Sequence, residues 1–182
     1  MKKLCFASLF ALLVINASFS QETKNDKTAI DSQTNFNELK LNGLFLVLGA
    51  FEVTYERTIN EESAFGANLF IPFDDDISDV NYYISPYYRF YFGKKYAAGF
   101  YVEGFGMLNS TESYVWNSSS SFDERMESRT DFALGIGIGG KWVTKSGFVG
   151  EIGVGVGRNL FNNNDLDFEI IGKGGISLGY RF

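Results

Sequence analysis

Residues 132–142 alternate between large apolar side chains and glycine, and this pattern constrains the fold more than any other feature of the 182-residue chain. The apolar residues share one parity: Phe132, Leu134, Ile136, Ile138 and Trp142. The other parity holds glycines and Lys141. Period-two alternation places the two sets on opposite faces of a β-strand. Residues 148–157 and 170–182 repeat the pattern.

Glycine with isolated charges is an unusual face for a strand in water. It suits the crowded interior of a narrow barrel, because glycine removes side-chain volume and the apolar face then points to lipid. On this basis eight strands are predicted, at residues 38–48, 51–59, 63–73, 80–93, 97–109, 129–144, 148–160 and 167–182. The sequence therefore predicts an all-β fold, an eight-stranded antiparallel up-and-down transmembrane β-barrel, with no helix after Glu38.

The connections between the predicted strands alternate in length. Tight turns are expected at residues 59–62, 94–96 and 145–147, a short first hairpin at 49–50, and longer polar loops at 73–79, 110–129 and 161–167. Short turns at one rim and longer loops at the other are typical of outer-membrane barrels, and an even strand number puts both termini on the periplasmic side. Outward aromatic residues near the short-turn rim predict a girdle at the membrane interface: Tyr88, Phe90, Phe92, Trp142, Phe148, Tyr180 and Phe182.

The first 20 residues have the pattern of a secretory signal peptide. A basic start is followed by an apolar run from Leu4 to Ile15, and Ser18 and Ser20 precede the expected cleavage before Gln21. The apolar run is shorter than the roughly 20 residues of a membrane-spanning helix. We therefore expect an exported protein, with a flexible periplasmic lead-in at 21–37 and the barrel at 38–182.

Composition excludes several function classes. The chain contains no histidine, and its single cysteine, Cys5, lies in the leader. Catalysis by a histidine base, thiol chemistry and disulfides are therefore excluded from the mature protein. The net charge of −6 also argues against nucleic acid as a partner, because affinity for it comes mainly from Lys and Arg.

Ten charged residues have the inward parity, five acidic and five basic: Lys40, Glu52, Glu56, Arg89, Glu103, Lys141, Glu151, Glu169, Lys173 and Arg181. A buried charge without a partner costs several kcal/mol, so a neutral set predicts paired networks. A turn centred on Tyr96 places Arg89 opposite Glu103, and one centred on Ser146 places Lys141 opposite Glu151. We expect each pair to lie within salt-bridge distance as a structural plug; the alternative is a proton or ion path through the lumen.

No motif in the chain predicts a cofactor or a metal. Residues 135–140 fit the spelling G-x-G-x-x-G, but the alternation continues through the glycines and no helix follows, as a dinucleotide site would require. The acidic loop tips at 74–79 and 162–167 do not have the spacing of a known calcium loop, so solvated loops are expected.

The loop at 110–129 is the predicted interaction surface. It contains Tyr114, Trp116 and Phe122 among serines and charges. A protruding hairpin of this kind would bind a protein partner by pairing at a strand edge. The alternative is a mobile, variable surface loop.

The residues from about 38 to 182 resemble the small eight-stranded outer-membrane β-barrels of the OmpA/OmpX type. The C-terminal Gly179-Tyr180-Arg181-Phe182 is similar to the signal read by the barrel-assembly machinery, and the resemblance assigns Tyr180 and Phe182 to it. Ser177 stands where that signal prefers glycine. Residues 84–92 also look like strands of uncharacterised members of this group, so the resemblance supplies no activity.

Together these features predict a non-enzymatic integral protein of the bacterial outer membrane, porin-like in architecture but with no open pore. Its role would be structural, or interaction through its longer loops, and its partners the lipid bilayer and, during insertion, the assembly machinery. The alternatives are a lipid- or peptide-modifying enzyme without histidine, a small-solute channel, and a soluble lipocalin-like carrier whose apolar residues face inward.

Overall fold

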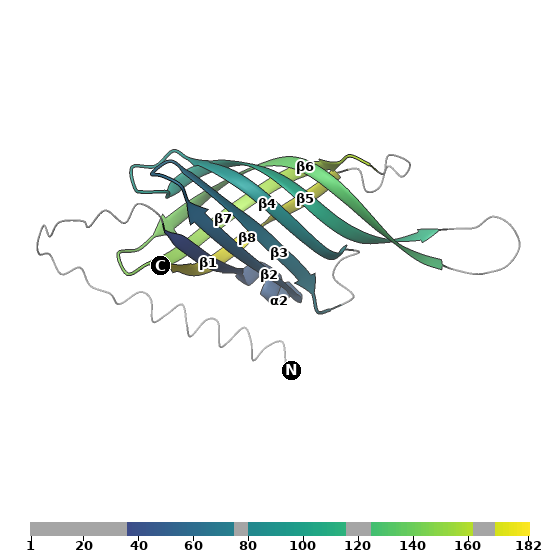
Figure 1. Cartoon of the computed structure of the whole chain (residues 1–182). Coiled ribbons are helices and arrows are strands. Elements are labelled where there is room, and N and C mark those ends of the chain that lie inside the picture. The colour runs from purple at the N-terminus through teal and green to yellow at the C-terminus, as the bar shows by residue number, and fades with distance from the viewer. Residues whose placement is uncertain (1–35, 75–79, 116–124, 162–169) are drawn as a thin grey trace, which may run out of the picture. The chain divides into compact units, whose positions relative to one another are not determined.

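The computed structural model describes residues 36–74, 80–115, 125–161 and 170–182, with the side chains of 112–115 and 125–127 excepted. The strands are β1 (Asn37–Asn42), β2 (Ala50–Thr58), β3 (Ser63–Pro72), β4 (Val80–Tyr91), β5 (Gly99–Val115), β6 (Arg125–Val143), β7 (Phe148–Asn159) and β8 (Ile170–Arg181). Each strand pairs antiparallel with the next, and β1 pairs with β8 to close the barrel (Figure 1). The predicted fold class, a closed eight-stranded antiparallel barrel, is confirmed.

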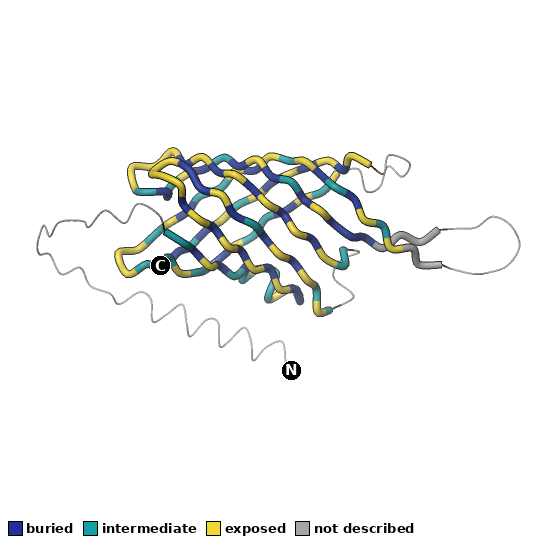
Figure 2. The backbone as a smooth tube through the Cα atoms, in the orientation of Figure 1, coloured by how far each residue is buried: buried dark blue, intermediate teal, exposed yellow. Residues whose placement is uncertain are grey.

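Large apolar side chains cover the outside of the barrel and charged side chains fill its inside. Leu134 is 53% exposed and Ile152 is 49% exposed, whereas Glu56 is fully buried. Exposed and buried residues alternate along the strands (Figure 2). This arrangement is the reverse of a water-soluble barrel, so it excludes the lipocalin-like alternative. The residues of the predicted aromatic girdle are all exposed on the outer face.

The first predicted strand is too long, and the expectation of no helix after Glu38 is wrong. β1 ends at Asn42, and a short helix, α2 (Gly43–Leu48), follows. The Asn42 side chain accepts hydrogen bonds from the backbone N–H groups of Leu44 (3.1 Å) and Phe45 (3.3 Å), and Gly49 ends the helix at a φ of 113°. The segment 43–48 is apolar throughout, so it carries no alternation that distinguishes strand from helix. Among the described residues, no helix combines the length and apolar character needed to cross a membrane.

The hairpin of β5 and β6 is longer than predicted. β5 continues to Val115 instead of ending at residue 109, and β6 begins at Arg125 instead of residue 129. Most of the added residues are polar, so the alternation of apolar and small residues that marks a membrane strand is lost there. Residues 167–169 of the last predicted strand lie outside the described part of the chain. The other strand ends lie within two residues of their predicted positions.

Tight turns join β2 to β3, β4 to β5 and β6 to β7 at one rim of the barrel. The two ends of the barrel meet at this rim, where the backbone N–H of Asn37 donates to the Phe182 carbonyl at 2.9 Å and the reverse bond is 2.8 Å. α2 lies at the other rim, where β3 ends and β4 begins (Figure 1). We refer to these as the turn rim and the loop rim.

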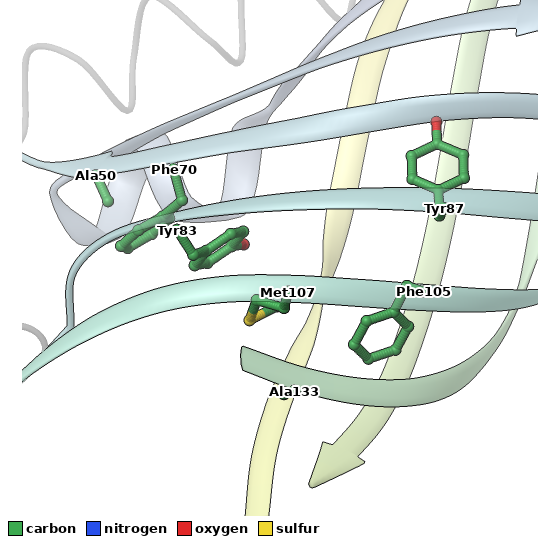
Figure 3. Close-up of a cluster of buried hydrophobic side chains, with 7 residues drawn as sticks. All are labelled: Ala50, Phe70, Tyr83, Tyr87, Phe105, Met107 and Ala133. Atoms are coloured by element: carbon green, nitrogen blue, oxygen red, sulfur yellow. The ribbon is translucent and has the colours of Figure 1, made fainter. Parts of the chain in front are cut away.

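Inward-facing glycines make room for aromatic side chains in the interior. A Cβ at Gly135 would overlap the ring of Phe105, and one at Gly139 would overlap the ring of Tyr101. Buried apolar side chains from β2 to β6 form a cluster that includes Phe70, Tyr83 and Phe105 (Figure 3). The rings of Phe70 and Tyr83 stack with their centroids 4.7 Å apart. The inward-facing glycines therefore leave the space that aromatic rings occupy in the lumen.

Candidate functional site

The interior of the barrel holds the predicted charged residues. Of the ten, Glu169 lies outside the described residues, Arg181 is partly buried, and the remaining eight are buried. They come from β1, β2, β4, β5, β6, β7 and β8, so the site depends on closure of the whole sheet.

The carboxylate of Glu56 is the centre of the network. Its Oε2 accepts from the Lys40 ammonium and from Arg89, each at 2.8 Å, and its Oε1 accepts from Lys141 at 2.5 Å. The hydroxyls of Tyr87 and Tyr91 also donate to it, at 2.8 and 2.7 Å. Three cations and two hydroxyls therefore surround one anion, and its loss of hydration is offset by hydrogen bonds to both oxygens.

Arg89 links Glu56 to two further carboxylates. It lies opposite Glu103 in the ladder of β4 and β5, as predicted, and its Nε donates to that carboxylate at 2.7 Å. Its other nitrogens contact Glu151 at 2.8 and 2.9 Å. The guanidinium carbon lies 4.2 Å from the ring centroids of both Tyr87 and Tyr101, a cation–π arrangement. Arg89 is thereby fixed by contacts on its edges and on its flat faces.

The predicted ion pair between Lys141 and Glu151 is wrong, although their register is correct. The two residues are direct partners in the ladder of β6 and β7. The Lys141 ammonium instead contacts Glu38 at 3.1 Å and Glu56 at 2.5 Å, whereas Glu151 pairs with Lys40 at 2.6 Å and with Arg89. A lysine side chain is long enough to cross a narrow lumen, so neighbours along the wall compete with residues on the opposite wall.

Sequence reasoning missed Glu38 and the interior tyrosines. Glu38 is fully buried, and it pairs with Lys141 and with Arg181, whose Nη2 lies 2.6 Å away. It has the same parity as Lys40, and this signal was available in the sequence. Tyr83, Tyr87 and Tyr91 likewise share the parity of Arg89, and all are buried.

The described network is neutral. Its members are five carboxylates and five basic groups: Glu38, Glu52, Glu56, Glu103, Glu151, Lys40, Arg89, Lys141, Lys173 and Arg181. Glu52 takes part through hydrogen bonds from the Tyr83 hydroxyl and from the Asn42 amide (3.2 Å), and Lys173 lies 2.8 Å from Glu103. These ten groups balance in charge with Glu38 as the fifth acid. The predicted set contained Glu169, which lies outside the described residues, so its neutrality stays a prediction. Asp131 is a further buried carboxylate of the described residues.

The network leaves a cavity of about 30 Å³ in the lumen, lined by Asn42, Glu52, Arg89, Glu103 and Lys173 among others. This volume accommodates about one water molecule. Side chains of the network therefore occupy the lumen around this cavity.

Several predicted site residues lie elsewhere or outside the described part of the chain. The side chain of Tyr114 is not described, and Trp116 and Phe122 fall in the undescribed segment 116–124. The acidic loop tips, apart from Asp74, also lie outside it. Tyr180 and Phe182 are exposed on the outer face at the end of the chain, 54% and 62% respectively. In the described residues, no three or more Asp, Glu, His or Cys side chains gather as a metal site would require.

An outward apolar surface, a closed eight-stranded sheet and a salt-bridged interior define the class of small transmembrane β-barrels. Comparison with solved structures gives the same class. The N-terminal β-barrel domain of Pseudomonas aeruginosa OprF superposes with a TM-score of 0.56 at 14% identity, over 82% of this chain and 97% of that domain. The chain therefore has the fold of a small outer-membrane β-barrel.

Two further solved structures are similar over most of their length. Neisserial surface protein A matches with a TM-score of 0.42 at 14% identity, over 81% of this chain and 93% of that protein. Ail, the attachment invasion locus protein of Yersinia pestis, matches with a TM-score of 0.39 at 16% identity, over 82% of this chain and 94% of that protein. In comparisons by sequence, no family model and no curated protein matches the chain.

Proposed function

We propose that the protein is an integral, non-enzymatic barrel of the bacterial outer membrane, closed to solutes, with a structural or interaction role through its loop rim. The observation that carries this proposal is that apolar side chains face outward and charged side chains face inward, the reverse of a water-soluble barrel. Its outer face is apolar, with residues such as Leu134 and Ile136 more than half exposed, and its charges are paired inside. Water would not stabilise that surface, whereas hydrocarbon does.

Membrane fractionation combined with gel mobility before and after heating tests the insertion. We expect the protein in the outer-membrane fraction, with a mobility that changes on heating because the barrel stays folded in detergent until it is boiled. Recovery in the soluble fraction, or a mobility that heating leaves unchanged, would contradict the proposal.

The interior does not favour an enzyme or a channel. A Ser–Lys site needs an uncharged amine, whereas Lys40, Lys141 and Lys173 each contact a carboxylate. A channel needs continuous solvent, whereas the cavity between Arg89 and Lys173 holds about one water.

The hairpin of β5 and β6 supports the interaction role. Its strands pair with each other as far as Val115 and Arg125. Within the described residues, the ladder between β4 and β5 ends at Thr111, and the ladder between β6 and β7 ends at Ala133. The hairpin therefore extends beyond its neighbours and presents strand edges on both sides (Figure 1). Such edges pair with an added strand of another protein.

Photo-crosslinking tests this interaction role. A crosslinker at positions 112, 114, 126 and 128 of cells that express the protein should capture a protein partner, and one at 61 on the turn rim should not. Replacing residues 112–128 with an Asn-Gly turn should abolish capture while the heat-dependent mobility stays unchanged. Equal capture from both rims would contradict a role for the hairpin.

A further inference from the structure

A shallow apolar groove crosses the outer face of β5, β6, β7 and β8. Its volume is about 720 Å³, and its walls are Phe100, Ile138, Trp142, Ile152 and Ile176, with Leu44 of α2 among the further lining residues. These side chains are 44% to 63% exposed, so the groove opens away from the barrel interior.

The absence of a side chain at Gly140 creates the floor of the groove. Gly140 pairs with Phe100 on one neighbouring strand and with Ile152 on the other, and all three have the outward parity. A Cβ at this position would meet the Trp142 ring at 3.4 Å and more, which is ordinary contact. Unlike the inward Gly139, Gly140 is therefore not required by the packing of its own chain, and glycine weakens a strand.

The groove reaches the turn rim beside basic turns. Phe100 lies at the start of β5 and Trp142 near the end of β6. The turns next to them carry the exposed Lys94, Lys95 and Lys145, and neither turn contains an acidic residue. The acidic turn with Glu61 and Glu62 joins β2 to β3, which do not line the groove. Its backbone contacts the β4–β5 turn, where the Ala97 N–H donates to the Glu61 carbonyl at 2.7 Å.

We propose that this groove binds one acyl chain of an anionic phospholipid whose headgroup lies against Lys94, Lys95 and Lys145. In an inserted barrel the isoleucine walls lie at hydrocarbon depth and Trp142 at the interface, and a concave surface makes more dispersion contacts with a chain than a convex one does. The lysines then lie at headgroup level, where ammonium groups attract a phosphate. The inference rests on the proposed insertion into a membrane, because only there do chain and headgroup meet the protein together.

Native mass spectrometry of the full barrel, released from nanodiscs, tests this binding. The nanodiscs contain equal amounts of phosphatidylglycerol and phosphatidylcholine with the same acyl chains. We expect the wild-type barrel to retain one lipid and to prefer phosphatidylglycerol. Gly140→Leu fills the floor of the groove and should abolish retention. Gly104→Leu is the matched control, because Gly104 also faces outward, lies outside the groove and has open space around it.

Lysine variants test the headgroup contact independently of strand packing. Each Lys→Gln change at positions 94, 95 and 145 should reduce the preference for phosphatidylglycerol about fivefold. Lys→Arg changes at the same positions keep the positive charge and should leave the preference unchanged. These lysines lie in exposed turns, so their substitution does not disturb strand packing. The lysine variants therefore test the proposal even if Gly140→Leu fails to fold.

Three results would overturn the proposal: equal retention of the two lipids by the wild type, retention by a folded Gly140→Leu barrel, and a dimer of the chain that Gly140→Leu disperses. Heat-dependent mobility is measured on every sample. A wild-type protein that lacks heat-dependent mobility contradicts the proposed membrane insertion. A wild-type protein that is inserted but shows no lipid preference contradicts only the proposed lipid binding in the groove.

Discussion

Glu56 shows how a single residue determines the stability of the interior. Its carboxylate contacts Lys40, Arg89 and Lys141, all of which are buried. Removing one member of a buried ion pair leaves the other charge without compensation. The stability lost in this way exceeds the net stability that the pair contributes. The carboxylate therefore compensates the charges of its three buried neighbours.

We expect Glu56→Ala to lower the free energy of unfolding by about 3–5 kcal/mol, because it leaves three cations around a vacated carboxylate site. Urea titration in lipid vesicles, followed by tryptophan fluorescence, measures this change. Glu61→Ala in an exposed turn is the control, with an expected effect within about 0.5 kcal/mol. Equal midpoints for the two variants would show that the network is not a stabilising element.

Two glycines of opposite parity give a second prediction at the scale of the residue. A Cβ at Gly139 overlaps the Tyr101 ring and the Ile152 carbonyl, whereas a Cβ at Gly104 has nothing within 4 Å. We expect Gly139→Val to destabilise the barrel by about 1–3 kcal/mol or more, because overpacking displaces neighbouring groups. Gly104→Val should be neutral or stabilising, because valine favours a strand.

The same urea titration, carried out on both variants, checks this difference. A Gly139→Val barrel as stable as Gly104→Val would show that the inner and outer faces of the sheet do not differ in packing.

At the scale of the element, regular hairpins were predictable and α2 was not. Turns centred on Tyr96 and Ser146 define the partners of Arg89 and Lys141 in the ladder, because antiparallel pairing is set by the turn. The segment 43–48 has no polar residue to mark a face. Its helical form depends instead on Asn42, which caps the helix and also donates to Glu52 and to the Gly174 carbonyl of β8.

Asn42→Ala should therefore loosen α2. Loss of an N-cap costs about 0.5–2 kcal/mol, so we expect faster hydrogen exchange of the amides of residues 44–48 by a factor of about 2 to 30. Asn42→Ser keeps a capping oxygen and should restore much of the protection. Unchanged exchange in Asn42→Ala would show that packing against β2 and β8 alone holds the helix.

At the scale of the whole molecule, closure of eight strands determines what the interior can contain. The interior contains the buried apolar cluster of Phe70, Tyr83 and Phe105 and the ion-pair network around Glu56. The cavity beside this network has a volume of about 30 Å³. A cavity of this size is too small for a file of hydrated ions, so we expect the charged interior to act as a packed plug.

Planar bilayers that contain the reconstituted barrel should therefore show no stable unitary current in ~1 M KCl. At this salt concentration an open pore gives a signal well above the noise, and charges more than about 3 Å apart are screened. A porin with a water-filled channel, measured in the same bilayers, is the positive control. Reproducible unitary steps from the folded barrel would contradict the closed lumen.

The sequence by itself determined which residues face inward and outward, because side-chain direction in a strand depends only on parity. Leu134 and Ile152 lie outside and Arg89 and Lys141 inside for this reason. Only the tertiary structure decided which charges meet across the lumen. Lys141 reaches Glu38 and Glu56 across the lumen rather than Glu151 beside it, because closing the sheet brings residues 103 and 85 positions apart within contact distance. Local spacing carries no record of such contacts, since they arise when the last strand joins the first.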